Sequence, residues 1–227
     1  MPRRYRLGER TAQMQATRER ILEAAIDLYT EQGISRTTLR QVSLRADIAP
    51  GTLRNHFPGR DDLELAMIER LTAEAPLPDL SIFDGLQTIE ARLERLIHVT
   101  ATFVDRARRL YRMWLREPML SDPWLQAGAV YGARWEELTR MALGALADDK
   151  DARAVMRAVS EPSFFESIRA GQTDGHLASP GGRTVEQAAA LISQVLSPWF
   201  AARAAAAESP ASPLPDRSPR SVRRVPR

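Results

Sequence analysis

The segment Pro50–His56 contains residue types that read the edges of nucleic-acid bases. Gly51 and Thr52 are small, which lets the backbone approach a groove closely. Arg54 can pair with a phosphate or a guanine, and Asn55 can pair with an adenine. Thr52 can bind a phosphate or touch a thymine methyl group. The alternative interpretation is a short core helix whose outer face is merely polar.

This segment is expected to be the second of two short helices. They cover about residues 39–46 and 50–56 and are joined by a three-residue turn. Thr38 and Gln41 form a capping box that starts the first helix, and Pro50 suits the first position of the second. These are the proportions of a helix-turn-helix unit, whose second helix enters the major groove. The expected inward side chains are Leu39, Val42, Ala46, Ile48, Leu53 and Phe57.

Residues for other kinds of chemistry are scarce. The chain has no cysteine, and its three histidines, His56, His98 and His176, lie far apart in sequence. Disulfides, thiolate metal sites and a cysteine nucleophile are therefore excluded, and a histidine metal site is disfavoured. There is no HExxH pattern, no Glu-x-x-His pair and no glycine-rich phosphate loop. We therefore expect neither an enzyme nor a bound cofactor or metal.

Charge is distributed unevenly along the 227 residues. Residues 1–60 hold 11 Arg and 6 acidic residues, whereas residues 61–207 hold 16 basic and 21 acidic residues. A basic N-terminal segment followed by an acidic remainder indicates that the N-terminal segment binds a polyanion. No apolar stretch reaches the roughly 18 residues of a membrane span, and no apolar run follows the basic start. We expect a cytoplasmic protein with no membrane partner.

The whole chain is predicted to be all-α. Apolar residues recur at helical spacing, and no segment shows strand-like alternation. A first helix is expected over about 16–32 and a fourth to about residue 73. Further helices are expected over 82–117 (split near 104–106), 122–147, 151–170 (interrupted near Pro162) and from Thr184 onward.

This pattern predicts four regions. Residues 1–14 form a flexible basic arm, residues 15–62 the helix-turn-helix domain, residues 63–207 a larger helical domain, and residues 208–227 a disordered basic tail. The arm could enter a minor groove and the tail could attract phosphates. Alternatively, both are solvated ends without a specific role.

The larger domain is rich in aromatic residues. A pocket walled by such side chains suits a flat, apolar ligand with one or two polar handles. The alternative is that these residues are ordinary core. The candidate pocket residues are His98, Phe103, Tyr111, Trp114, Trp124, Tyr131 and Trp135.

The last helix is too apolar to stand alone in water. We expect it to pack against its symmetry mate in a dimer, although burial within its own subunit is the alternative. The candidate interface residues are Ile192, Val195, Leu196 and Trp199.

The stretch from Thr17 to Leu63 resembles the DNA-binding domain of the TetR family of transcriptional regulators. The resemblance covers about a fifth of the chain, without gaps. The later helices fit the family's ligand-binding domain only in length and helicity. The matching residues are Ile21-Leu22, Ala24-Ala25, Leu28-Tyr29, Gly33, Thr37-Thr38-Leu39, Ala46, Ile48, Gly51-Thr52-Leu53, His56-Phe57 and Asp61-Asp62-Leu63.

The resemblance implies a two-domain homodimer that binds a palindromic operator and responds to a small molecule. It implies that Thr38 lies beside a phosphate and that Arg60 replaces a lysine that meets one. The candidate DNA contacts are Thr38, Arg40, Pro50, Gly51, Thr52, Arg54, Asn55, His56 and Arg60.

Three residues depart from the family pattern. Asp47 stands at a usual glycine, Ala49 at a usual N-cap serine, and Arg54 at a tyrosine that usually meets phosphate. Asp tolerates left-handed geometry, and loss of the cap costs about 0.5–2 kcal/mol. None of these changes removes DNA binding.

We therefore expect a DNA-binding regulator, in the family's usual mode a repressor released from its operator by a small apolar or aromatic effector. The alternative is a helical ligand-binding or scaffold module without sequence-specific DNA recognition.

Overall fold

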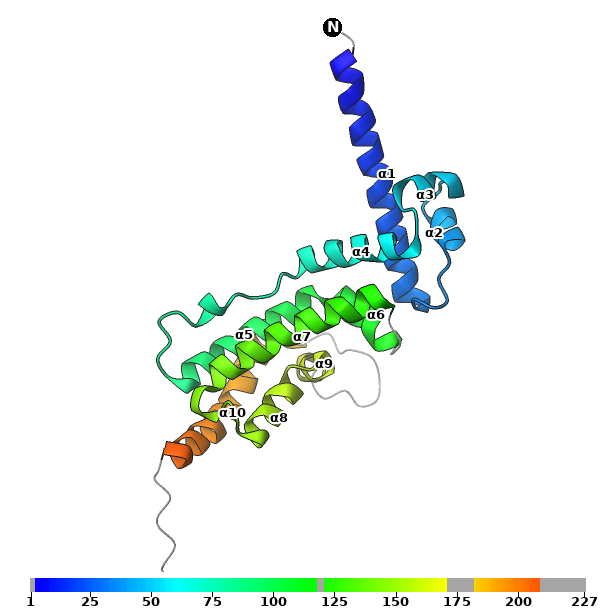
Figure 1. Cartoon of the computed structure of the whole chain (residues 1–227). Helices are drawn as coiled ribbons and strands as arrows, with labels where there is room; N and C mark the ends of the chain where they lie inside the picture. Colours follow the sequence, from blue (N-terminus) through cyan, green and yellow to red (C-terminus); the bar gives the residue numbers. More distant parts are fainter. Residues whose placement is uncertain (1–2, 118–120, 171–181, 209–227) are drawn as a thin grey trace, which may run out of the picture.

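The structure, a computed structural model, describes residues 3–117, 121–170 and 182–208. Within these ranges it contains helices and no strands, so the all-α prediction is confirmed (Figure 1). The DNA-binding candidates lie on the first four helices: α1 (Arg3–Gln32), α2 (Leu39–Arg45), α3 (Pro50–His56) and α4 (Arg60–Glu74). The larger body comprises α5 (Ile89–Arg106), α6 (Arg108–Arg116), α7 (Asp122–Leu143), α8 (Lys150–Val159), α9 (Pro162–Ala170) and α10 (Val185–Glu208). Two short 3-10 turns cover Leu80–Phe83 and Gly144–Leu146.

The helix α1 begins much earlier than expected. We predicted a flexible arm over residues 1–14, but the structure continues the helix through residues 3–14, and this corrects the arm. Residues 3–32 contain no proline, and Gly8 is the one weak helix former among residues 3–14 that lacks a side chain. The hydroxyl of Thr17 donates to the Gln13 carbonyl at 2.9 Å, and Gln15 donates to Glu19 at 3.0 Å. The N-terminal half of α1 projects away from the molecule (Figure 1). The predicted tail over 208–227 lies outside the described residues, except for Glu208, which ends α10.

The C-terminal half of α1 packs in the first hydrophobic core. Its buried stripe, including Ile21, Ala25 and Tyr29, packs against α2, α3 and α4. The same core takes side chains from the larger body. The predicted boundary after residue 62 therefore does not separate two cores. The side chains that α4 and the later helices add are Leu63, Ala66, Met67, Leu71, Ala75, Phe103, Ala107, Leu110, Met113 and Trp124.

The second core lies where α5 packs between α7 and α10 (Figure 1). The helix α5 starts at Ile89 rather than at residue 82, because Gly85 takes φ +78 and Thr88 caps the helix at the Ala91 amide. The expected break in the helix over residues 82–117 falls at Ala107, close to the predicted position near residues 104–106. The helix α7 starts one residue early, with Ser121 as its N-cap.

The expected start of the last helix is confirmed. The Thr184 amide donates to the Gln187 side chain at 2.9 Å, and the Gln187 amide donates to the Thr184 hydroxyl at 3.2 Å. These two bonds make the predicted capping box, which satisfies two backbone N–H groups at the helix end. The break before Pro162, between α8 and α9, is confirmed as well.

Candidate DNA-binding surface and ligand pocket

The turn between α2 and α3 forms as the local sequence dictates. The Gln41 amide donates to the Thr38 hydroxyl at 3.2 Å, and the Thr38 amide donates to the Gln41 side chain at 2.8 Å. Asp47 takes the left-handed φ of +52 that a turn requires here. Pro50 starts α3, and Ala49 gives it no side-chain cap. The turn therefore forms although Asp47 and Ala49 depart from the family pattern.

Two buried anchors fix the orientation of α3. Leu53 and Phe57 are each 1% exposed in the first core. The opposite face carries Gly51, Arg54 and Asn55, which are exposed. Within the described residues, the polar side chains of this helix make no hydrogen bond or ion pair. A Cβ built on Gly51 would meet nothing within 4 Å, so the fold leaves open space there. This face is free to contact another molecule.

The end of α3 is also held by α1. The Arg18 guanidinium lies 4.4 Å from the centroid of the Phe57 ring. This cation–π contact joins the C-terminal end of α3 to α1. Sequence analysis did not identify Arg18 because the contact joins residues 39 positions apart.

Arg60 is bonded to partners within the protein. Its Nε donates to a Glu64 carboxylate oxygen at 2.8 Å, and another N–H donates to the Ile34 carbonyl. The guanidinium also lies 5.7 Å from the Tyr29 ring centroid. Because its side chain is still 38% exposed, its assignment as a phosphate contact stays a prediction. By contrast, Arg40 and Thr38 are exposed.

A buried carboxylate joins three helices at this point. Glu64 of α4 is 0% exposed. It accepts hydrogen bonds from the Tyr29 hydroxyl at 2.9 Å, from Arg60 and from the Ser121 hydroxyl. Burial, and then the charge of Glu64, raise the pKa of Tyr29 above its ordinary value. The network fastens α4 to both α1 and the start of α7.

The raised pKa of Tyr29 predicts an alkaline loss of stability. Above pH 10 an unfolded tyrosine releases its proton while folded Tyr29 retains it, so the folded state binds more protons. The free energy of unfolding must then fall as pH rises above about 10. Urea denaturation between pH 9 and 11.5 should show this fall, and Tyr29→Phe should make it shallower. An equal slope in both proteins would contradict the prediction.

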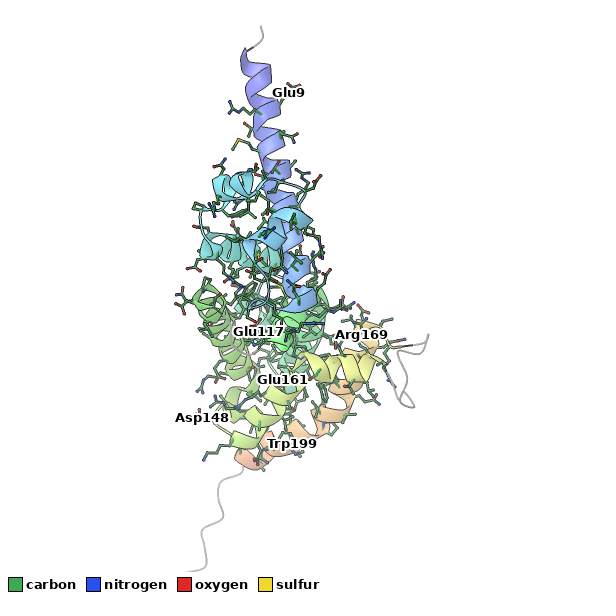
Figure 2. The ribbon with its side chains drawn as sticks, turned by 90° about the vertical axis from the view of Figure 1, so that its right-hand side faces the viewer. Glu9, Glu117, Asp148, Glu161, Arg169 and Trp199 are labelled. Atoms are coloured by element: carbon green, nitrogen blue, oxygen red, sulfur yellow. The ribbon has the colours of Figure 1, made fainter. Side chains whose placement is uncertain are left out.

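A second set of contacts joins α6 to the helix-turn-helix domain. Arg109 pairs with Glu23 at 2.7 Å, and an Arg116 N–H donates to the Glu31 carbonyl. Glu117 accepts a hydrogen bond from the Ser35 amide at 2.9 Å, and that contact holds its pKa below the ordinary value. Figure 2 shows Glu117 at the end of α1, where the larger body begins. The helix α6 is thus fastened along α1.

The other face of α6 lines an aromatic pocket of about 300 Å³. Phe103 of α5 is its centre: ring centroids lie 6.2 Å away in Tyr111, 5.9 Å in Tyr131 and 5.1 Å in Trp135. Gly128 and Gly132 of α7 complete one wall, and Glu161 lies at the junction of α8 and α9. The structure brings together five of the predicted pocket residues: Phe103, Tyr111, Trp114, Tyr131 and Trp135.

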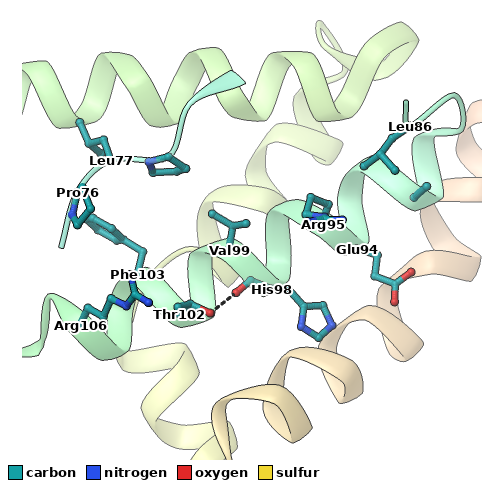
Figure 3. A pocket seen from close by; sticks show the side chains of 12 residues that line it. Pro76, Leu77, Leu86, Glu94, Arg95, His98, Val99, Thr102, Phe103 and Arg106 are labelled. Carbon is teal, nitrogen blue, oxygen red and sulfur yellow. Dashed lines mark hydrogen bonds between the residues drawn. The ribbon is translucent and has the colours of Figure 1, made fainter. Parts of the chain in front are cut away.

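Two predicted pocket residues lie elsewhere. Trp124 is 3% exposed in the first core, so it is a packing residue. His98 lines a different, open groove of about 770 Å³ between α5 and the segment 76–78 (Figure 3). That groove carries charges of both signs, from Glu94, Arg95 and Arg106. Sequence analysis missed the two glycines and Glu161, because none of them is aromatic.

The predicted dimer residues divide between two faces of α10. Ile192 is 3% exposed and packs in the second core of its own subunit, so it is a packing residue. Leu196 packs against the same core but is only partly buried, and Val195 and Trp199 are 65% and 37% exposed. The assignment of these three residues to a dimer interface stays a prediction.

Membrane-spanning helices and metal-binding groups were also sought among the described residues. In the described part of the chain, no helix is both long and apolar enough to cross a membrane. The same residues contain no group of three His, Asp or Glu side chains that could hold a metal ion.

Residues 21–67 match the family model of bacterial regulatory proteins, tetR family. Over these residues, about a fifth of the chain, the protein is similar to the N-terminal domain of the TetR family. The match covers the C-terminal part of α1, all of α2 and α3, and the first half of α4. The curated proteins that the chain resembles are named as transcriptional regulators.

Curated transcriptional regulators are similar to part of the chain. The chain is 29% identical over 92 residues to the HTH-type transcriptional regulator SrpR of Pseudomonas putida, which is 38% of this chain and 42% of SrpR. It is 31% identical over 100 residues to the regulator AcrR of Shigella flexneri, which is 42% of this chain and 45% of AcrR. The matched segment therefore spans less than half the length of either relative.

A solved structure extends the similarity of fold to the larger body. The crystal structure of AibR, in complex with isovaleryl coenzyme A and operator DNA, superposes with a TM-score of 0.57 at 15% sequence identity. The match covers 80% of this chain and 98% of AibR. At this identity the likeness establishes a shared fold.

Proposed function

We propose that the protein is a transcriptional regulator that reads an operator with the outer face of α3. The observation that carries the proposal is the unpartnered polar face of α3 on a TetR-family helix-turn-helix domain. Arg54 and Asn55 are exposed there, beside the open space over Gly51. A helix presented in this way can enter a major groove and reach base edges.

The reading unit is a homodimer on an inverted repeat. A helix-turn-helix of this kind contacts one half-site, and a two-fold axis relates the two half-sites. The exposed Val195 and Trp199 on α10 supply an apolar patch that a second copy can cover. In Figure 2 Trp199 lies far from α1, so pairing there leaves the DNA-binding surface free.

Ligand binding is coupled to DNA binding through α6. One face of this helix supplies Tyr111 and Trp114 to the aromatic pocket, and its other residues Arg109 and Arg116 hold α1. A ligand that displaces α6 therefore changes the position of α1, and with it the spacing of the two reading helices. AibR, which has the same fold, was crystallised with both a small molecule and operator DNA.

Selection of binding sites from a random duplex pool tests the proposal. The purified protein should recover an inverted repeat whose half-sites are separated by about one helical turn. Recovery of no common sequence, with only salt-sensitive retention of DNA, would favour the alternative of a scaffold without sequence-specific recognition.

Arg40 provides a test of the phosphate contacts. Arg40 is exposed on α2, whereas Arg60 is paired with Glu64 and only partly exposed. Arg40→Ala should weaken binding to all sequences and reduce the slope of log K against log salt by about 1. Fluorescence anisotropy across a salt series, with the selected duplex, measures this slope. An unchanged slope in Arg40→Ala would remove Arg40 from the set of DNA contacts.

A further inference from the structure

We propose that the N-terminal half of α1 is a further DNA-contacting element, a basic helix that lies along the phosphates flanking each half-site. The proposal rests on the proposed function, because it extends the DNA-binding surface beyond α3. It stands on the direction of the helix, on the positions of its arginines and on the exposure of residues 8–16.

The direction of α1 is the first observation. In Figures 1 and 2 the N-terminal half of α1 continues past the other helices of the DNA-binding unit, on the side away from the larger body. The Arg18 guanidinium, 4.4 Å from the Phe57 ring centroid, marks where α1 passes the end of α3. From Arg18 to Arg3 the helix rises about 22 Å. A duplex bound to the outer face of α3 therefore passes close to this half of α1.

The positions of the arginines are the second observation. Thr17 and Ile21 belong to the buried stripe of α1, with exposed fractions of 8% and 0%. At about 3.6 residues per turn, the same stripe continues toward the N-terminus through positions 10, 6 and 3, and all three are arginine. The stripe that faces the other helices of the unit thus becomes basic where α1 leaves them. Arginine suits phosphate, because its planar guanidinium can bind two phosphate oxygens at once.

The exposure of this half of α1 is the third observation. Residues 8–16 are all exposed, and the first buried side chain among those described in α1 is that of Thr17. Arg10 makes no hydrogen bond or ion pair with another described residue. Residues 3–14 contain four arginines and one glutamate, so they bring positive charge to this end of the molecule. Duplex DNA, with one negative charge per about 1.7 Å of its axis, is a partner of matching charge.

The helical form decides which part of the duplex is contacted. An α-helix with its side chains is about 10–12 Å wide, whereas the minor groove is about 6 Å wide. The helix α1 therefore cannot enter the minor groove as a flexible arm could, and its arginines meet phosphates instead. Phosphate contacts position a protein without reading base sequence. At about 3.4 Å per base pair, a helix of this length spans roughly six base pairs of flanking duplex.

The test compares the full chain with a stripe variant, in which the three arginines of the stripe are replaced by glutamine, another good helix former. A control variant replaces Arg95, Arg106 and Arg157, which are exposed on the larger body, and loses the same charge. Binding is measured by fluorescence anisotropy on two duplexes. One duplex ends at the edges of the selected inverted repeat, and the other is longer by about eight base pairs on each side.

We expect the full chain and the control variant to bind the longer duplex at least about tenfold more tightly than the shorter one. The stripe variant should bind both duplexes equally. On the longer duplex its slope of log K against log salt should be smaller by about 3 per subunit. No gain from the longer duplex in the full chain, an undiminished gain in the stripe variant, or an equal loss in the control variant would overturn the proposal.

Ala12→Pro tests whether the helical form is needed. Proline inside a helix removes a backbone hydrogen bond and kinks or breaks the helix, while the arginines remain. We expect the gain from the longer duplex to be lost as in the stripe variant. A retained gain would assign the contact to a flexible arm and overturn the helical docking. Sedimentation without DNA should give the same oligomeric state for all variants, and a change in the stripe variant would assign the segment to subunit pairing instead.

These outcomes are separable from those of the proposed function. If the full chain selects no operator, the proposed function fails, and the salt slope on a random-sequence duplex still compares the full chain with the stripe variant. If the full chain selects an operator and the stripe variant keeps the gain from the longer duplex, only the role of α1 is overturned.

Discussion

Replacing Glu64 with alanine should lower the free energy of unfolding by about 2–4 kcal/mol. Glu64 is 0% exposed and accepts hydrogen bonds from three side chains on α1, α4 and the start of α7. Its removal leaves the buried Tyr29 hydroxyl without an acceptor and Arg60 without its carboxylate partner. Because the Arg60 side chain is 38% exposed, water compensates part of that second loss.

Urea denaturation at neutral pH and fixed protein concentration measures the effect. Glu69→Ala, on the exposed side of the same helix, is the matched control and should change stability by less than about 0.5 kcal/mol. Glu64→Gln retains an acceptor and should fall between the two. If Glu64→Ala is no less stable than Glu69→Ala, the network does not hold the two parts of the molecule together.

The double variant Arg54→Ala with Asn55→Ala should weaken operator binding at least about 100-fold. Both side chains are exposed on α3 and make no interaction within the described structure, so their loss removes DNA contacts without disturbing the core. Each base contact of this kind contributes about 1–3 kcal/mol. Fluorescence anisotropy with the selected duplex measures the change.

Arg157→Ala is the control for charge, because Arg157 is exposed on α8 at the other end of the molecule (Figure 1). It should bind the operator like the unaltered protein. Sedimentation should show the same oligomeric state for all three proteins. Operator binding that survives the double variant would mean that α3 is not the reading helix.

The local features of the reading unit could be predicted from sequence. The Thr38 capping box, Pro50 at the start of α3 and the left-handed Asp47 depend on residues only a few positions apart. The short-range geometry of the backbone decides such features, so their residue types are sufficient. Most of the aromatic residues that line the pocket could also be predicted from composition, because large aromatic side chains gather between helices.

The placement of other residues depends on partners that are distant in sequence. Arg60 bonds to Glu64 and Ile34 and lies near the Tyr29 ring because these three residues meet in space. His98 and Phe103 are five residues apart on α5, which rotates them by about 140° relative to each other. His98 lines the larger groove, whereas Phe103 lies between that groove and the aromatic pocket and lines both. Neither outcome is encoded in the local pattern around the residue.

The first core contains side chains from α1 to α4 and also Phe103, Leu110, Met113 and Trp124 from the larger body. The helices α1 to α4 therefore have no self-contained interior. A fragment ending after α4 would expose the apolar surface that these four side chains cover, at a cost of roughly 25 cal/mol per Å². We therefore expect the two parts of the chain to unfold together as one cooperative unit, and a fragment ending after α4 not to fold on its own.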